Sequence, residues 1–158
     1  MAAARPFGSA HDAIRRSSAI VGALTVSDLA DALAGHPRIG ERPDAASDTP
    51  SVAPHYRAGS GNEAPIRARA ADWSAQEQSG VDAKDATTRQ ALAEANNQYE
   101  QRFGHIYLVC ATGRTGAELL DVLHNRLQNE PEDEWQVVRA ELQKINALRL
   151  QQILVESP

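Results

Sequence analysis

A histidine between a helix end and a proline is the first group in the chain that suits proton transfer. His36 opens the tripeptide His36-Pro37-Arg38, directly after a predicted helix that ends near Ala34. Because a helix end fixes the backbone that follows it, the imidazole can be aimed, and imidazole titrates near neutral pH. The pattern indicates a general acid or base. The alternative is an ordinary histidine in a surface loop.

A second group brings a hydroxyl, a carboxylate and an amide onto one predicted helical turn. Its members are Ser74, Glu77 and Gln78. Ser74 and Glu77 have the spacing of a capping box, in which the two side chains only close the helix N-terminus. The alternative is a site for a small polar heterocycle, since the free N–H groups of a helix N-terminus favour an anionic ligand.

The last predicted helix carries an arginine on its inward face. Trp135, Val138, Leu142 and Ile145 recur at spacings of three and four residues, and Arg149 continues the stripe. A charge on a core-facing stripe must be paired or must reach water near the helix end. Arg149 is therefore either a snorkelling side chain or a guanidinium that faces a carboxylate or carbonyl of a buried ligand.

The spacing of other reactive residues argues against several common sites. Cys110 and Arg114 are separated by three residues, a shorter gap than the loop of cysteine phosphatases requires, so we predict a turn with Thr115 as a helix N-cap. The histidines show no paired ligand spacing and no HExxH, which argues against a metal site. The Gly-x-Ser-x-Gly elbow of many hydrolases is missing as well.

Helices must position all of these groups. Apolar spacing and capping patterns predict helices over 12–24, 25–34, from near 74, 85–102, 115–127 and 129–154. The run from His105 to Ala111 is β-branched and aromatic, but no second strand is available to pair with it. We expect it to be a short extended or helical segment buried among helices. The prediction is an all-α, single-domain bundle of about six to seven helices over residues 1–158.

The composition argues against a nucleic-acid or membrane partner. The chain has 158 residues, of which 42% are hydrophobic and 23% charged, close to globular averages, and its net charge is −5. This mild acidity argues against nucleic-acid binding, which usually needs a basic face. No apolar run approaches the roughly 20 residues that span a bilayer. With Cys110 as the single cysteine, we expect a cytoplasmic protein without a membrane or nucleic-acid partner.

Five motifs in a fixed order resemble those of one family. They are His36-Pro37-Arg38-Ile39-Gly40, Ser74-x-x-Glu77-Gln78, Tyr99-x-x-Arg102-Phe103-Gly104-His105, Asn125-Arg126-Leu127 and Arg149-Leu150. From about Thr25 to Leu154 the chain resembles the 2-oxo-4-hydroxy-4-carboxy-5-ureidoimidazoline (OHCU) decarboxylases. The resemblance implies an all-α lyase of purine metabolism, commonly a homodimer, that needs no cofactor and converts OHCU to (S)-allantoin in urate degradation. Members usually carry additional N-terminal residues, so the N-terminal part of this chain is expected to be shortened.

The resemblance also implies the roles of individual residues. His36 and Glu77 would be catalytic, and either can deliver the final proton. No metal ligand is implied. The substrate-binding residues would be Pro37, Ser74, Gln78 and Arg149, together with a stretch whose backbone lines the pocket, formed by Ile106, Tyr107, Leu108, Val109 and Cys110.

Two other functions fit the same residues. The first is an inactive helical homologue that serves as a ligand- or partner-binding module. The second is a small hydrolase in which His36 and Glu77 activate water on a ureido or imidazoline ring. Product analysis separates the hydrolase from the lyase, because only the lyase releases carbon dioxide.

Overall fold

Five α-helices make up the part of the chain that the structure describes. The structure is a computed structural model that describes residues 8–34, 36–39 and 86–155. The helices are α1 (Ala10–Gly22), α2 (Val26–Leu33), α4 (Ala86–Phe103), α5 (Gly116–Arg126) and α6 (Pro131–Val155), and no strand occurs among these residues. The all-α prediction is confirmed. The helix predicted from near Ser74 lies outside the described residues. None of the described helices is long and apolar enough to cross a membrane.

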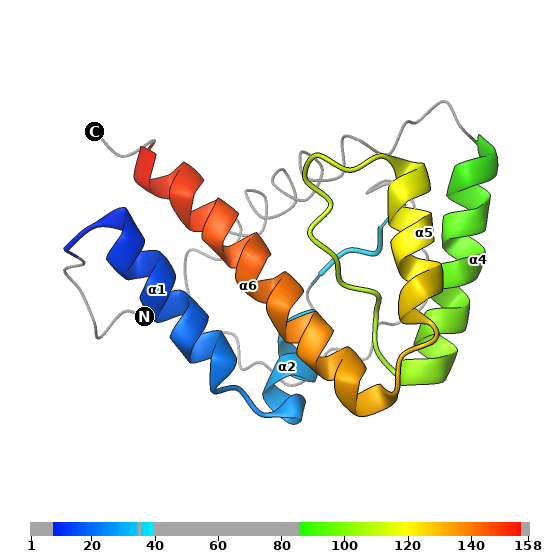
Figure 1. The fold of residues 1–158 in the computed structure, drawn as a ribbon, viewed down its shortest axis with the longest axis horizontal. Helices are drawn as coiled ribbons and strands as arrows, with labels where there is room; N and C mark the ends of the chain where they lie inside the picture. The colour runs from blue at the N-terminus through cyan, green and yellow to red at the C-terminus, as the bar shows by residue number, and fades with distance from the viewer. Residues whose placement is uncertain (1–7, 35, 40–85, 156–158) are drawn as a thin grey trace, which may run out of the picture.

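The helices form two packed pairs with a non-helical segment between them. α1 packs on α6, and α4 packs on α5. Figure 1 shows the chain leaving α4, running between α6 and α5, and then entering α5. Residues 106–111 of this connection form neither helix nor strand, and they are called the extended segment below. α2 lies beside the middle of α6 in this view.

Side-chain caps set the helix starts. Thr25 with Asp28 and Thr115 with Glu118 form complete capping boxes, which confirms both predicted N-caps. α1 begins at Ala10, two residues before its predicted start, because the Ser9 hydroxyl accepts a hydrogen bond from the Asp12 amide at 3.1 Å.

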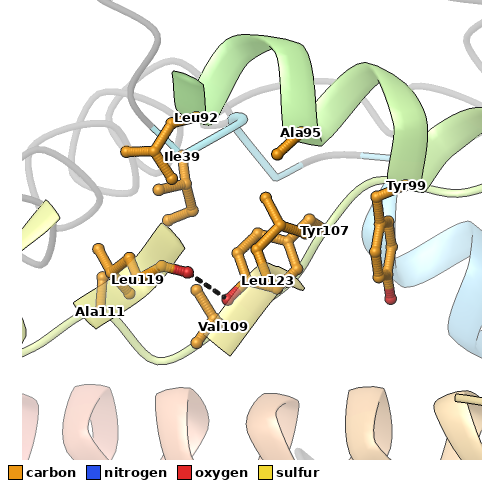
Figure 2. Close-up of a cluster of buried hydrophobic side chains, with 9 residues drawn as sticks. All are labelled: Ile39, Leu92, Ala95, Tyr99, Tyr107, Val109, Ala111, Leu119 and Leu123. Atoms are coloured by element: carbon orange, nitrogen blue, oxygen red, sulfur yellow. Dashed lines mark hydrogen bonds between the residues drawn. The ribbon is translucent and has the colours of Figure 1, made fainter. Parts of the chain in front are cut away.

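The extended segment divides the hydrophobic core into two clusters. Its side chains alternate between them, which is the periodicity of an extended chain. Tyr107, Val109 and Ala111 pack with residues of α4 and α5 and with Ile39 (Figure 2), and the Tyr107 hydroxyl donates to the Leu119 carbonyl. Ile106, Leu108 and Cys110 pack with residues of α1, α2 and α6. The segment is therefore buried among helices, as predicted.

A buried ion pair joins α4, α5 and α6. Arg126 is 5% exposed and Glu134 is 0% exposed, and the Arg126 Nε donates to Glu134 Oε1 at 2.8 Å. The Tyr99 hydroxyl donates to the same carboxylate, and the Asn129 side-chain amide donates to its other oxygen at 2.7 Å. Burial raises the pKa of the Tyr99 hydroxyl, so it stays a donor. The Arg126 Nη1 also donates to the Leu108 carbonyl at 2.7 Å, which ties this network to the extended segment.

Glu134→Ala should lower the free energy of unfolding by about 3–5 kcal/mol, because it leaves the buried Arg126 charge without its carboxylate. Urea unfolding followed by far-UV circular dichroism measures this change. Glu132→Ala is the matched control, since Glu132 lies exposed in the same helical turn and should change stability by less than about 1 kcal/mol. Equal effects of the two substitutions would contradict the assigned role of the ion pair.

Candidate active site

The last turn of α2 orients His36. The His36 backbone N–H donates to the Leu33 carbonyl at 2.9 Å, and the ring Nδ1 lies 3.1 Å from the Ala32 carbonyl oxygen. Because a carbonyl oxygen only accepts, Nδ1 must carry a hydrogen, and a neutral ring then has its lone pair on Nε2. The half-buried imidazole is thus fixed in both tautomer and direction by the helix that precedes it.

The residues after His36 are anchored to α4 at two points. The Arg38 guanidinium binds the Glu100 carboxylate in a two-pronged contact, with Nε to Oε1 and Nη2 to Oε2 both at 2.7 Å. The Asn96 side chain, which is 4% exposed, donates to the Ile39 carbonyl at 3.0 Å. A fork-to-fork contact fixes orientation as well as distance. Pro37 lies exposed between His36 and these anchors.

Side chains replace the missing partner strand along the extended segment. The Leu108 carbonyl accepts from Arg126, and the Cys110 N–H donates to the Glu141 carboxylate at 2.8 Å. The two bonds approach from α5 and from α6. They lie on either side of Val109 and fix the middle of the segment.

Three consecutive backbone donors of the extended segment precede the Cys110 anchor, and the last of them, at Val109, lies between the two anchored groups. Tyr107, Leu108 and Val109 are buried. Within residues 8–34, 36–39 and 86–155, no hydrogen bond uses the N–H group of any of the three. Buried backbone N–H groups in proteins are nearly always paired. These groups are therefore suited to receive an acceptor atom of a ligand.

His105 directly precedes the extended segment, and its ring is uncharged. Its ring lies against Trp135, with ring centroids 4.1 Å apart, and its Nδ1 is 3.1 Å from the Ile106 carbonyl oxygen. Burial lowers the pKa of His105, so the imidazole is neutral at pH 7.

Arg149 lies on α6, half-buried and two turns beyond Glu141. Val138, Leu142 and Ile145 are buried on the same helix, which confirms the predicted inward stripe. Figure 1 shows α6 passing in front of part of α2, with the extended segment between α6 and α5. The Arg149 guanidinium is on the same helix as Glu141, whose carboxylate accepts the Cys110 N–H.

Three of the elements that carry predicted site residues meet in one cluster. Leu33, three residues before His36, packs together with Leu108 of the extended segment and Ile145 of α6. The other predicted site residues, Ser74, Glu77 and Gln78, lie outside the described residues. Among the described residues, no group of three or more His, Cys, Asp or Glu side chains could hold a metal ion.

Two polar residues at this site escaped the sequence analysis. Asn96 is buried on α4 without any local motif that would mark it. Glu141 could have been noticed, since it lies on the inward side of α6, three residues after Val138 and four before Ile145. A carboxylate at such a position needs a hydrogen-bonding partner.

The chain matches the model of the OHCU decarboxylase family over residues 1–151. It belongs to this family. The crystal structure of an OHCU decarboxylase in the presence of (S)-allantoin has a similar fold, with a TM-score of 0.71 and 25% sequence identity. That match covers 98% of this chain and 87% of the other. The resemblance carried by the five motifs is therefore confirmed.

Curated relatives of this OHCU decarboxylase family chain include longer proteins. The uric acid degradation bifunctional protein TTL of Arabidopsis thaliana is 34% identical over 128 residues, which is 80% of this chain and 34% of that protein. The 2-oxo-4-hydroxy-4-carboxy-5-ureidoimidazoline decarboxylase of Amia calva is 39% identical over 79 residues, which is 50% of this chain and 45% of that protein. The aligned region thus spans less than half the length of each.

Asn96→Ala should destabilise this family member by about 1–3 kcal/mol, because the Ile39 carbonyl loses its buried donor. Hydrogen exchange should also speed up in the peptide that carries His36 to Ile39, compared with peptides from α5. Asn97→Ala is the control, since the neighbouring Asn97 side chain is exposed. Unchanged exchange around His36 in the Asn96 variant would show that this bond does not hold the loop.

Proposed function

We propose that the chain is a cofactor-independent carboxy-lyase that converts OHCU to (S)-allantoin in urate degradation. Family membership supports this reaction, and the similar crystal structure was obtained in the presence of (S)-allantoin. The observation that carries the proposal is the set of buried N–H groups at Tyr107, Leu108 and Val109. These donors make no hydrogen bond within the described residues, and they lie in the element that meets α6 and the end of α2.

The reaction needs a place for one electron pair. The bond between the ring carbon and the carboxylate breaks, carbon dioxide leaves, and the electron pair moves into the imidazoline ring onto a carbonyl or imine. Fixed donors at that atom stabilise the transition state, because the negative charge develops there. We assign this role to the segment N–H groups near Val109 and to Arg149.

A proton must then reach the neighbouring ring carbon, which bears the ureido group, and the substrate hydroxyl must give up its proton to become the carbonyl of allantoin. The one proton that the loss of carbon dioxide consumes comes from water. His36 is suited to these transfers, since its Nδ1 hydrogen faces the Ala32 carbonyl and leaves Nε2 to take up the hydroxyl proton and then donate a proton to the ring carbon. Glu77 is the second proton carrier, while Pro37, Ser74 and Gln78 hold the substrate with Arg149. A donor placed on one face of the ring delivers its proton from that face only. The product is therefore (S)-allantoin rather than a racemate.

The test is circular dichroism of urate passed through urate oxidase and hydroxyisourate hydrolase, with and without this protein. We expect faster loss of OHCU, a growing (S)-allantoin signal and release of carbon dioxide. A rate equal to the spontaneous one would favour a binding-only homologue and contradict the proposal. Ring opening without carbon dioxide would assign the small-hydrolase function instead.

His36→Ala should lower kcat for OHCU by about 10²–10⁴-fold, the usual contribution of a general acid or base. The far-UV circular dichroism spectrum should stay unchanged, because the hydrogen bond of the ring to the Ala32 carbonyl lies at the last turn of α2 and adds no backbone bond to the helix. His124→Ala is the control, since His124 lies exposed in the last turn of α5 and should keep wild-type turnover. Turnover near wild type in the His36 variant would remove His36 from the mechanism.

The cytoplasmic location and the homodimer belong to the same proposal. Family resemblance supports the dimer, and the use of a single cysteine supports a reducing compartment. Light scattering on the purified chain should give twice the 17.0 kDa mass of one copy. A mass of one copy at micromolar concentration would contradict the dimer, and recovery outside the cytoplasmic fraction of the source cells would contradict the location.

A further inference from the structure

We propose that Glu141 is a positioning residue that fixes the donor groups of the extended segment relative to α6, the helix that carries Arg149. This inference rests on the proposed function and extends it to a residue outside the predicted site. Glu141 would act through the backbone at Cys110 and would not touch the substrate.

The position of Glu141 calls for an explanation. Its side chain is 6% exposed although it carries a carboxylate. Burying a carboxylate is costly unless hydrogen bonds compensate for the lost water. One oxygen accepts the Cys110 N–H at 2.8 Å, and the other accepts from Lys144 Nζ at 2.6 Å. An aliphatic residue would continue the α6 stripe without the cost of desolvation, but it could not hold the Cys110 amide.

The bond to Cys110 has two consequences for the donor set. It occupies the Cys110 N–H, which leaves the N–H groups of Tyr107, Leu108 and Val109 as the donors for a ligand. It also completes a pair of anchors, because Arg126 holds the Leu108 carbonyl on the other side of Val109. Because both neighbouring peptide groups are held, the Val109 N–H cannot rotate away from a negative charge that develops on the substrate.

α6 then sets the distance between the N–H groups of the extended segment and the Arg149 guanidinium. Glu141 and Arg149 are eight residues apart on one continuous helix, which corresponds to about 12 Å along its axis. The hydrogen bond of Glu141 to Cys110 therefore fixes the N–H groups of the extended segment relative to α6, the helix that also carries the Arg149 guanidinium. Without Glu141, the Cys110 N–H loses the side-chain acceptor that ties it to α6.

Glu141→Ala should lower kcat for OHCU about 10–100-fold and change KM less than about threefold. The reason is that displaced donors weaken binding of the charge that develops in the transition state more than binding of the ground state. Glu141→Gln should keep kcat within about threefold of wild type, because its amide oxygen can still accept the Cys110 N–H. Lys144→Ala is the matched control, since it removes only the ion pair on the other oxygen.

The single cysteine allows a direct measurement of the anchor. Labelling with [¹⁵N]cysteine gives one backbone amide signal, that of Cys110, in the full-length chain. Its hydrogen exchange should be slow in the wild type, Glu141→Gln and Lys144→Ala, and at least about tenfold faster in Glu141→Ala. A purely structural loss would speed exchange throughout the protein, and Glu141→Gln would not rescue kcat.

The outcomes separate this inference from the function on which it rests. A wild-type chain that leaves OHCU loss at the spontaneous rate removes the proposed function. An active wild type with unchanged kcat in folded Glu141→Ala overturns the inference alone. If Glu141→Ala does not fold, Glu141→Gln decides. If Glu141→Gln keeps its kcat and the Cys110 amide exchanges slowly, the positioning role is supported. If Glu141→Gln loses most of its kcat although the Cys110 amide still exchanges slowly, the positioning role is overturned, because the reaction would then need the charge of Glu141 and not its hydrogen bond to Cys110.

Discussion

The extended segment lies between helix pairs with no strand beside it in the described part of the chain, and its backbone groups must find partners elsewhere. A strand in a sheet receives these bonds from its neighbours. Here the bonds come from side chains, with Arg126 of α5 on the Leu108 carbonyl and Glu141 of α6 on the Cys110 amide. Because these side chains reach the segment from opposite sides, they also hold the two helix pairs against it.

Because side chains pair the backbone groups of the extended segment, charged residues are buried in the core. Arg126 would be costly to bury alone, so its charge is matched by Glu134, and that carboxylate in turn accepts from Tyr99 and Asn129. Replacing a buried ion pair with apolar residues is often neutral or stabilising in proteins. In this chain such a replacement would leave the Leu108 carbonyl without its donor. The network is therefore required by the backbone geometry of the segment more than by the stability of the pair itself.

Local sequence patterns predicted the local structure well. The capping residues Thr25 and Thr115 and the stripe on α6 were read correctly, because each depends on residues at most a few turns apart. The anchors could not be predicted in this way. Arg38 meets Glu100 across 62 positions and Asn96 meets Ile39 across 57, and neither spacing follows from helix periodicity. The partners of the extended segment depend on how the helices pack, which a single sequence does not reveal.

The same segment connects the fold to the proposed chemistry. An element with all of its amides paired would be more stable, but it would have nothing to offer a ligand. The buried N–H groups of Tyr107, Leu108 and Val109 make no hydrogen bond within the described residues, and unpaired buried donors cost stability. An acceptor atom on a substrate offsets that cost, most strongly where it carries negative charge. Side chains therefore hold the segment at the Leu108 carbonyl and the Cys110 amide, while the N–H groups of Tyr107, Leu108 and Val109 remain for a ligand, an arrangement that a hydrogen-bonded sheet would not permit.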